Sequence, residues 1–126
     1  MLHQNITNQI IKSFYTVYNT LGFGFLEKVY ENALYIELIS LGLTVERQKP
    51  IKVRYKDRQV GDYYADLIVE DLVIIELKAA EALAPEHESQ LINYLKATDI
   101  EVGLLLNFGK RPEIKRKLFN NNLKNP

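Results

Sequence analysis

Three charged residues stand inside otherwise apolar stretches of the sequence. Asp66 lies within Tyr-Tyr-Ala-Asp-Leu-Ile-Val, and Glu76 and Lys78 lie within Val-Ile-Ile-Glu-Leu-Lys. Burying a charge is costly unless the charge is paired or bound to a metal ion. Two carboxylates and an ammonium on one face of a sheet suit a hard divalent cation with a water molecule beside it. Such a cation polarises a phosphoryl oxygen and activates water, so phosphodiester hydrolysis is the expected chemistry.

The same three residues are compatible with other interpretations. Glu76 and Lys78 could form one ion pair on the exposed face of an amphipathic sheet, with no catalytic role. A pair of carboxylates also serves the hydrolysis of sugars, so a sugar- or small-phosphate-directed hydrolase is a further alternative. The adjacent lysine favours phosphodiester chemistry, because an ammonium can orient water or offset charge on the phosphorus.

The three residues meet only in one strand register. Glu76 and Lys78 differ by two positions and therefore share a face of their strand. Asp66 joins them when opposed residues have numbers with an even sum, since opposed residues point to the same side of a sheet. A two-residue turn at Glu70 and Asp71 would place Asp66 on the other face. The site therefore needs a connection of three or five residues, or a bulge.

Hydrophobic periodicity indicates the elements that must position these residues. The predicted elements, in chain order, are helices over about 5–21 and 26–41, strands over about 51–55, 64–69 and 72–79, a helix over 85–98 and a strand over 102–107. A turn is expected over 56–61, and Pro50 suggests that its strand lies at a sheet edge. Residues 112–122 fit either a helix or an alternating strand. The prediction is an α/β fold in the order α-α-β-β-β-α-β, a mixed sheet of about four strands flanked by helices.

Composition restricts the class of protein. A chain of 126 residues with 47% hydrophobic residues fits a single domain over residues 1–126 with its own core. The sequence has no cysteine, which excludes a disulfide scaffold, a thiolate metal site and a cysteine nucleophile. We expect a cytoplasmic protein without a membrane partner, because no signal-peptide pattern and no membrane-spanning apolar run is present.

The formal net charge of zero hides four blocks of opposite sign. The net charge is −2 over residues 1–46, +5 over 47–61, −8 over 62–101 and +5 over 102–126. An acidic middle between basic segments is typical of a cation-binding centre inside a surface that binds a polyanion. Carboxylates exposed by chance on a helix–strand segment would give the same pattern. The last block predicts a basic C-terminal tail over about 110–126.

Asp66, Glu76 and Lys78 form the motif D…E-x-K, which resembles that of the PD-(D/E)XK nuclease superfamily. Two further stretches, in the order along the chain that the superfamily has, add to this resemblance. The stretch G-F-L-E-K-V-Y over 24–30 matches the pattern that names the GxxExxY protein family, a small branch of that superfamily. The stretch H-E-S-Q-L-I-N-Y over 87–94 resembles the Q-x-x-x-Y segment of RecB-like and lambda-exonuclease-like nucleases. The resemblance covers about residues 5–119 and implies a restriction-endonuclease-like fold. An alanine stands before Asp66, where the superfamily pattern has proline.

The resemblance implies a role for each matched residue. The metal ligands would be Asp66, Glu76 and the backbone carbonyl of Leu77, holding Mg2+ or Mn2+. The catalytic residues would be Lys78, Glu27 and Gln90. Nucleic-acid contacts are implied for Tyr94 and for the basic residues Lys52, Arg54, Lys56, Lys110, Arg111, Lys115, Arg116 and Lys117. Two further candidates have structural alternatives: His87 as a hydrogen-bonded structural histidine, and Tyr30 as a packed tyrosine with a bonded hydroxyl.

The expected function is Mg2+- or Mn2+-dependent hydrolysis of nucleic-acid phosphodiester bonds, with DNA as the expected substrate. The alternative from another class is a catalytically silent, nuclease-like module that binds nucleic acid or a protein partner. The joint presence of Asp66, Glu76, Lys78 and Gln90 argues against a decayed site, which usually lacks a ligand. A homodimer or a protein partner is compatible with either function.

Overall fold

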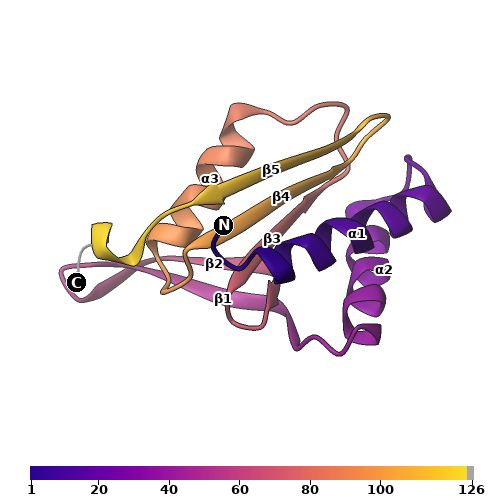
Figure 1. Cartoon of the computed structure of the whole chain (residues 1–126). Coiled ribbons are helices and arrows are strands. Elements are labelled where there is room, and N and C mark those ends of the chain that lie inside the picture. Colours follow the sequence, from indigo (N-terminus) through magenta and orange to yellow (C-terminus); the bar gives the residue numbers. More distant parts are fainter. Residues whose placement is uncertain (125–126) are drawn as a thin grey trace.

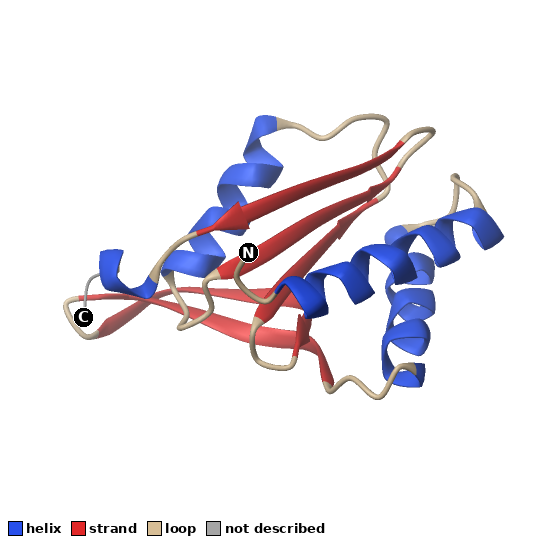
Figure 2. Cartoon of the chain, in the orientation of Figure 1, coloured by secondary structure: helices blue, strands red, loops and turns tan. Residues whose placement is uncertain are grey.

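A five-stranded mixed sheet forms the centre of the chain, which the computed structural model describes over residues 1–124 (Figures 1 and 2). The elements are α1 (Gln4–Leu21), α2 (Glu27–Ser40), β1 (Val45–Tyr55), β2 (Arg58–Val69), β3 (Val73–Lys78), α3 (Pro85–Lys96), β4 (Val102–Phe108), β5 (Pro112–Leu118) and the short 3-10 helix η1 (Asn121–Leu123). The predicted α/β class and element order are confirmed, with one strand added at the end. No helix within residues 1–124 is long and apolar enough to cross a membrane.

The strands lie in the sheet in chain order, β1-β2-β3-β4-β5. Neighbouring strands are antiparallel except for β3 and β4, which are parallel and joined through α3. The sheet has one strand more than the four expected, because the ambiguous segment forms β5. Seven residues of β5 pair with all of β4, from Pro112 opposite Phe108 to Leu118 opposite Val102. This pairing satisfies the backbone groups along the edge of a fully buried strand. Much of the expected basic tail is therefore an edge strand.

Helices cover both faces of the sheet, α1 and α2 on one side and α3 on the other (Figure 2). On the first face, Phe14 of α1 and Leu34 of α2 belong to the same buried cluster as Ile75 of β3. On the second face, Leu91 of α3 belongs to a cluster with Ile74 of β3. The alternation expected for β3 is thus confirmed, and its even-numbered residues face α3.

The β1–β2 hairpin is longer than expected, and its outer half leaves the rest of the sheet. The expected turn over 56–61 was wrong in extent: only Lys56 and Asp57 form it, with φ of 49° and 65°. Two residues with positive φ make a turn whose twist matches that of the strands, so β2 can begin at Arg58. Of β2, only Leu67, Ile68 and Val69 are paired with β3. The outer hairpin pairs with itself and projects toward the C-terminal segment (Figure 1).

Candidate active site

Asp66 and Glu76 face each other where β2 and β3 separate. The connection between these strands has three residues, because Val69 pairs with Val73. Opposed numbers therefore have an even sum, which is the register that the site requires. Continuing the register by one step from Leu67 opposite Ile75 places Asp66 opposite Glu76.

Side chains replace the backbone ladder at this fork. The Glu76 Oε2 atom accepts a hydrogen bond from the backbone N–H of Asp66 at 2.8 Å. The Asp66 Oδ2 atom accepts one from the backbone N–H of Leu77, also at 2.8 Å. Both carboxylates are therefore held in place by backbone donors and keep further lone pairs for another ligand.

The pKa values of both carboxyl groups are raised above their usual values. Burial and the neighbouring Asp66 charge raise the pKa of Glu76, which is only 6% exposed, to about 8. Burial also raises the pKa of Asp66, while the Leu77 N–H and the Gln48 amide oppose that rise. The positive charge of Lys78 lowers the pKa of both carboxyl groups without restoring the usual values. A bound cation would stabilise the ionised pair.

The donor set fits a hard cation that keeps much of its hydration shell. No group of three or more histidine, cysteine, aspartate or glutamate side chains converges within residues 1–124. Mg2+ is commonly held by one or two carboxylates, with water and substrate phosphate completing six ligands. Asp66 and Glu76 fit that pattern, and the Leu77 carbonyl is a further candidate ligand.

A polar network behind Asp66 was not predicted from the sequence. Gln48 lies in β1 with a left-handed φ of 49°. Its amide donates to Glu31 at 2.7 Å and to Asp66 at 3.3 Å. Glu31 is buried in α2 and forms ion pairs with Lys28 at 2.9 Å and Arg47 at 3.6 Å. Glu31 could have been found as the acid four residues after the GxxExxY glutamate, on the same helical face. Nothing in the local pattern distinguishes Gln48.

The GxxExxY residues shape the start of α2. Gly24 has φ of 111°, a conformation that favours glycine. Tyr30 is fully buried; its hydroxyl donates to the Gly22 carbonyl at 2.7 Å and accepts from the Phe25 N–H at 3.2 Å. Tyr30 is therefore a packing residue that fixes the loop before α2. Glu27 is exposed in the first turn of α2, and its charge contributes to the raised pKa of Glu76.

The α3 residues divide into a hydrogen-bonded pair and a helix cap. The Gln90 amide donates to the Tyr94 hydroxyl. Burial and the charges of Glu76 and Asp66 raise the pKa of Tyr94. His87 instead accepts the Ala84 N–H at 3.0 Å through Nδ1, which caps the first turn of α3. His87 thus makes a structural hydrogen bond, and a role for it in the site stays a prediction.

A second unpredicted network fixes the chain after Lys78. Asn107 of β4 is opposite Lys78 in the parallel pair and is completely buried. Its side-chain oxygen accepts the Ala80 N–H at 2.9 Å, and its amide donates to the Ala80 carbonyl at 3.0 Å and to Glu113 at 3.1 Å. This clamp orients the backbone that carries Lys78, two residues from Ala80.

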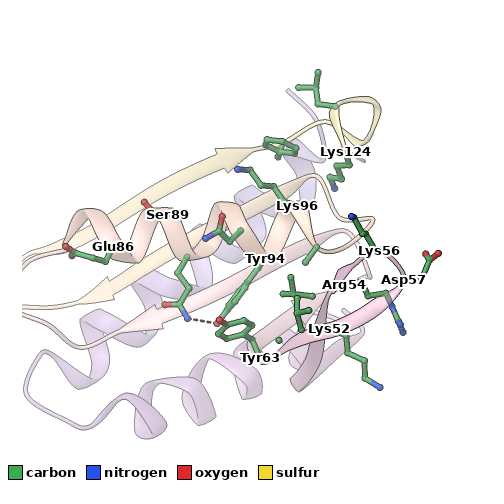
Figure 3. Close-up of a pocket in the computed structure, with 18 of the residues that line it drawn as sticks. Lys52, Arg54, Lys56, Asp57, Tyr63, Glu86, Ser89, Tyr94, Lys96 and Lys124 are labelled. Atoms are coloured by element: carbon green, nitrogen blue, oxygen red, sulfur yellow. Dashed lines mark hydrogen bonds between the residues drawn. The ribbon is translucent and has the colours of Figure 1, made fainter. Parts of the chain in front are cut away.

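A groove of about 1540 Å³ lies between α3, the outer β1–β2 hairpin and the C-terminal segment (Figure 3). We call it the α3 groove, and it is lined by Lys52, Val53, Arg54, Lys56, Asp57, Val60, Gly61, Tyr63, Pro85, Glu86, Ser89, Gln90, Asn93, Tyr94, Lys96, Ala97, Phe119, Leu123 and Lys124. Four predicted nucleic-acid contacts, Lys52, Arg54, Lys56 and Tyr94, thus share one surface.

The C-terminal basic residues are dispersed. Lys110 and Arg111 lie in the β4–β5 turn, at the end of the molecule opposite the hairpin tip (Figure 1). Lys117 forms an ion pair with Glu88 of α3, and the Arg116 guanidinium donates to a backbone carbonyl near the N-terminus. Lys115 is exposed on β5. These residues do not form one basic tail.

A mixed sheet with an acidic residue on its second strand and E-x-K on its third, covered by helices on both faces, defines a nuclease-like fold. The chain belongs to the PD-(D/E)XK nuclease superfamily, whose family model matches residues 4–117. The fold is also similar to the crystal structure of SSO0001, with a TM-score of 0.58 and 18% sequence identity. The match covers 75% of this chain and 50% of SSO0001, so the chain spans about half that protein's length. At this identity the similarity concerns the fold alone. No curated protein matches the sequence significantly.

Proposed function

We propose that the chain is a divalent-metal-dependent nuclease that hydrolyses phosphodiester bonds in nucleic acid, with DNA as substrate. The observation that carries the proposal is the linked pair of carboxylates on the fold of a nuclease superfamily, half-buried Asp66 and buried Glu76. Lys78 follows Glu76 by two residues on the same strand. The raised pKa of Glu76 indicates a centre that lacks positive charge in the protein alone.

The chain's own residues have distinct tasks in this proposal. Asp66, Glu76 and the Leu77 carbonyl would hold Mg2+ or Mn2+, which supplies Lewis acidity and an activated water when bound. Lys78 orients the attacking water or stabilises charge that develops on the phosphoryl oxygens. Glu27 of α2 and Gln90 of α3 would position water or Lys78.

Three finer parts of the proposal concern family, location and assembly. We infer that the chain belongs to the GxxExxY branch, which is supported by the positive φ of Gly24, the buried Tyr30 and the contribution of the Glu27 charge to the raised pKa of Glu76. We also infer a cytoplasmic location. Association with a second copy or a protein partner stays a prediction.

A nuclease panel tests the proposal. Purified protein with Mn2+ is incubated with single-stranded, double-stranded and branched DNA and with RNA, beside an Asp66→Ala control. The expected result is metal-dependent cleavage of DNA by the wild type and none by Asp66→Ala. Equal cleavage by both proteins would indicate a contaminant. Mn2+ binding without cleavage of any substrate would favour the silent binding module instead.

A further inference from the structure

The α3 groove has aromatic rings on its wall. Tyr63 of β2 is 48% exposed, and its ring centroid lies 5.7 Å from that of Tyr94 in α3 (Figure 3). Phe119 also lines the groove, with the Lys96 ammonium 5.5 Å from its ring centroid. Bases in a duplex are covered by their stacked neighbours, whereas unpaired bases can stack on aromatic side chains. An exposed ring in a groove is therefore suited to an unpaired strand.

The rim of the α3 groove is positively charged. Five basic side chains line it, against two carboxylates, Asp57 and Glu86. In the part of the chain that the structure describes, no carboxylate forms a salt bridge with any of the four groove residues Lys52, Arg54, Lys56 and Lys96. The fifth, Lys124, instead donates to backbone carbonyls at the end of α3. Cations without a carboxylate partner are available to neutralise phosphates.

The groove and the carboxylate pair share strand β2. Tyr63, which lines the groove, precedes Asp66 by three residues on this strand. Gln90 and Tyr94 also line the groove and are joined by a hydrogen bond, drawn as a dashed line in Figure 3. A strand bound against Tyr63 therefore lies near the candidate metal ligand Asp66.

We propose that the α3 groove binds single-stranded nucleic acid, with bases stacked on Tyr63 and Phe119 and phosphates held by Lys52, Arg54, Lys56 and Lys96. The groove then guides an unpaired strand to Asp66 and Glu76. Only this delivery step rests on the proposed nuclease function, because strand binding in the groove needs neither metal nor cleavage.

Fluorescence anisotropy in EDTA tests the groove separately from catalysis. The probes are a labelled oligothymidylate of about twelve nucleotides, an oligouridylate of the same length and a duplex of the same length. We expect the wild type to bind the oligothymidylate at least about tenfold more tightly than the duplex. Tyr63→Ala should weaken strand binding about tenfold, whereas Tyr63→Phe should retain it because the ring is kept. The oligouridylate decides between DNA and RNA, and tighter binding to it would support an RNA strand in the same groove.

The next residue along β2 supplies the matched control. Tyr64 is 53% exposed but does not line the groove, so Tyr64→Ala should bind like the wild type. Equal affinity for strand and duplex would contradict the proposal that the α3 groove binds single-stranded nucleic acid. Equal effects of Tyr63→Ala and Tyr64→Ala would contradict it as well. Circular dichroism verifies that each variant is folded. Strand binding without metal-dependent cleavage would refute the nuclease proposal alone. If Tyr63→Ala weakens strand binding but leaves the cleavage rate unchanged, the delivery of the strand from the groove to Asp66 and Glu76 is refuted.

Discussion

Asp66 and Glu76 are linked across the β2–β3 fork by a hydrogen bond of 2.8 Å from the Asp66 backbone N–H to the Glu76 carboxylate. The Asp66 carboxylate in turn accepts the N–H of Leu77. Each acid is thus oriented by the backbone of the strand opposite, before any metal binds. Preorganised ligands need little rearrangement when a cation binds. The electrostatic attraction between the carboxylates and the cation is therefore not offset by a cost of reorganisation.

Removing either carboxylate should abolish divalent-cation binding. Asp66→Asn or Glu76→Gln leaves one ionised ligand, and a titration with metal alone offers no substrate phosphate to complete the site. Isothermal titration with Mn2+ measures the loss. Asp62→Asn, an exposed change on the same strand, should bind as the wild type does. Unchanged Mn2+ affinity in both site variants would show that Asp66 and Glu76 are not the metal ligands.

The metal-free protein should lose stability as the pH rises from about 4.5 to about 8. The folded state holds a proton on Glu76 in this window because burial raises its pKa to about 8, whereas the unfolded state releases the proton near 4.5. The folded state therefore binds more protons, and the free energy of unfolding falls by an amount on the order of 5 kcal/mol. Chemical denaturation in EDTA at several pH values measures the fall.

Two variants separate this effect from general charge effects. Glu76→Gln keeps an oxygen that can accept the Asp66 N–H and carries no titrating proton, so most of the pH dependence should disappear. Glu81→Gln removes an exposed carboxylate and should retain the dependence. A Glu76→Gln profile identical to that of the wild type would show that Glu76 titrates normally.

Lys78 should act on the chemical step and not on substrate binding. Its ammonium is proposed to orient water or stabilise transition-state charge, so Lys78→Ala should lower turnover by about 100-fold while DNA affinity changes only a few-fold. Lys78→Arg should not restore turnover, because a guanidinium differs in shape and does not release a proton. Single-turnover cleavage and strand binding, measured on the same preparations, separate the two effects. Cleavage at the wild-type rate by Lys78→Ala would leave catalysis to the carboxylates and metal.

Gln48 should lower the pKa of Asp66 through one hydrogen bond. Its left-handed backbone permits Gln48→Gly without backbone strain. The variant also removes a donor from Glu31, which keeps its ion pairs with Lys28 and Arg47. Loss of the amide should raise the pKa of Asp66 further and weaken Mn2+ affinity several-fold, most strongly at acidic pH. Titration calorimetry across pH, with melting temperatures for comparison, checks this. The same affinity at every pH would mean that the 3.3 Å contact with Asp66 is incidental.

The sequence was most informative where periodicity and burial coincide. The apolar run of β3 predicted both its strand and the shared face of Glu76 and Lys78. The parity of the register required a connection of three or five residues, or a bulge, and the structure has the first of these. Local patterns could not predict β5, whose alternation is weak and whose pairing with β4 is tertiary. They also could not reveal Gln48 and Asn107, because each acts on residues far away in the sequence through contacts that only the folded chain creates.

The basic residues of the hairpin should make strand binding depend on salt. Each phosphate contact that is lost should reduce the slope of log affinity against log salt by about 0.7 for a single strand. Changing Lys52, Arg54 and Lys56 together to glutamine should therefore lower the slope by about 2. Anisotropy titrations of the oligothymidylate at several salt concentrations give the slopes.

A lysine on the other face of the sheet provides the control for this measurement. Lys12 is exposed on α1, which packs on the face of the sheet opposite α3, so Lys12→Gln should leave the slope unchanged. If the triple variant and Lys12→Gln both keep the wild-type slope, the hairpin cations face plain solvent. The pair Lys110→Gln and Arg111→Gln extends the test to the β4–β5 turn, which follows β4 at the Lys78 end of the sheet. A reduced slope in this variant as well would mean that the bound strand runs past the carboxylates to the far end of the molecule.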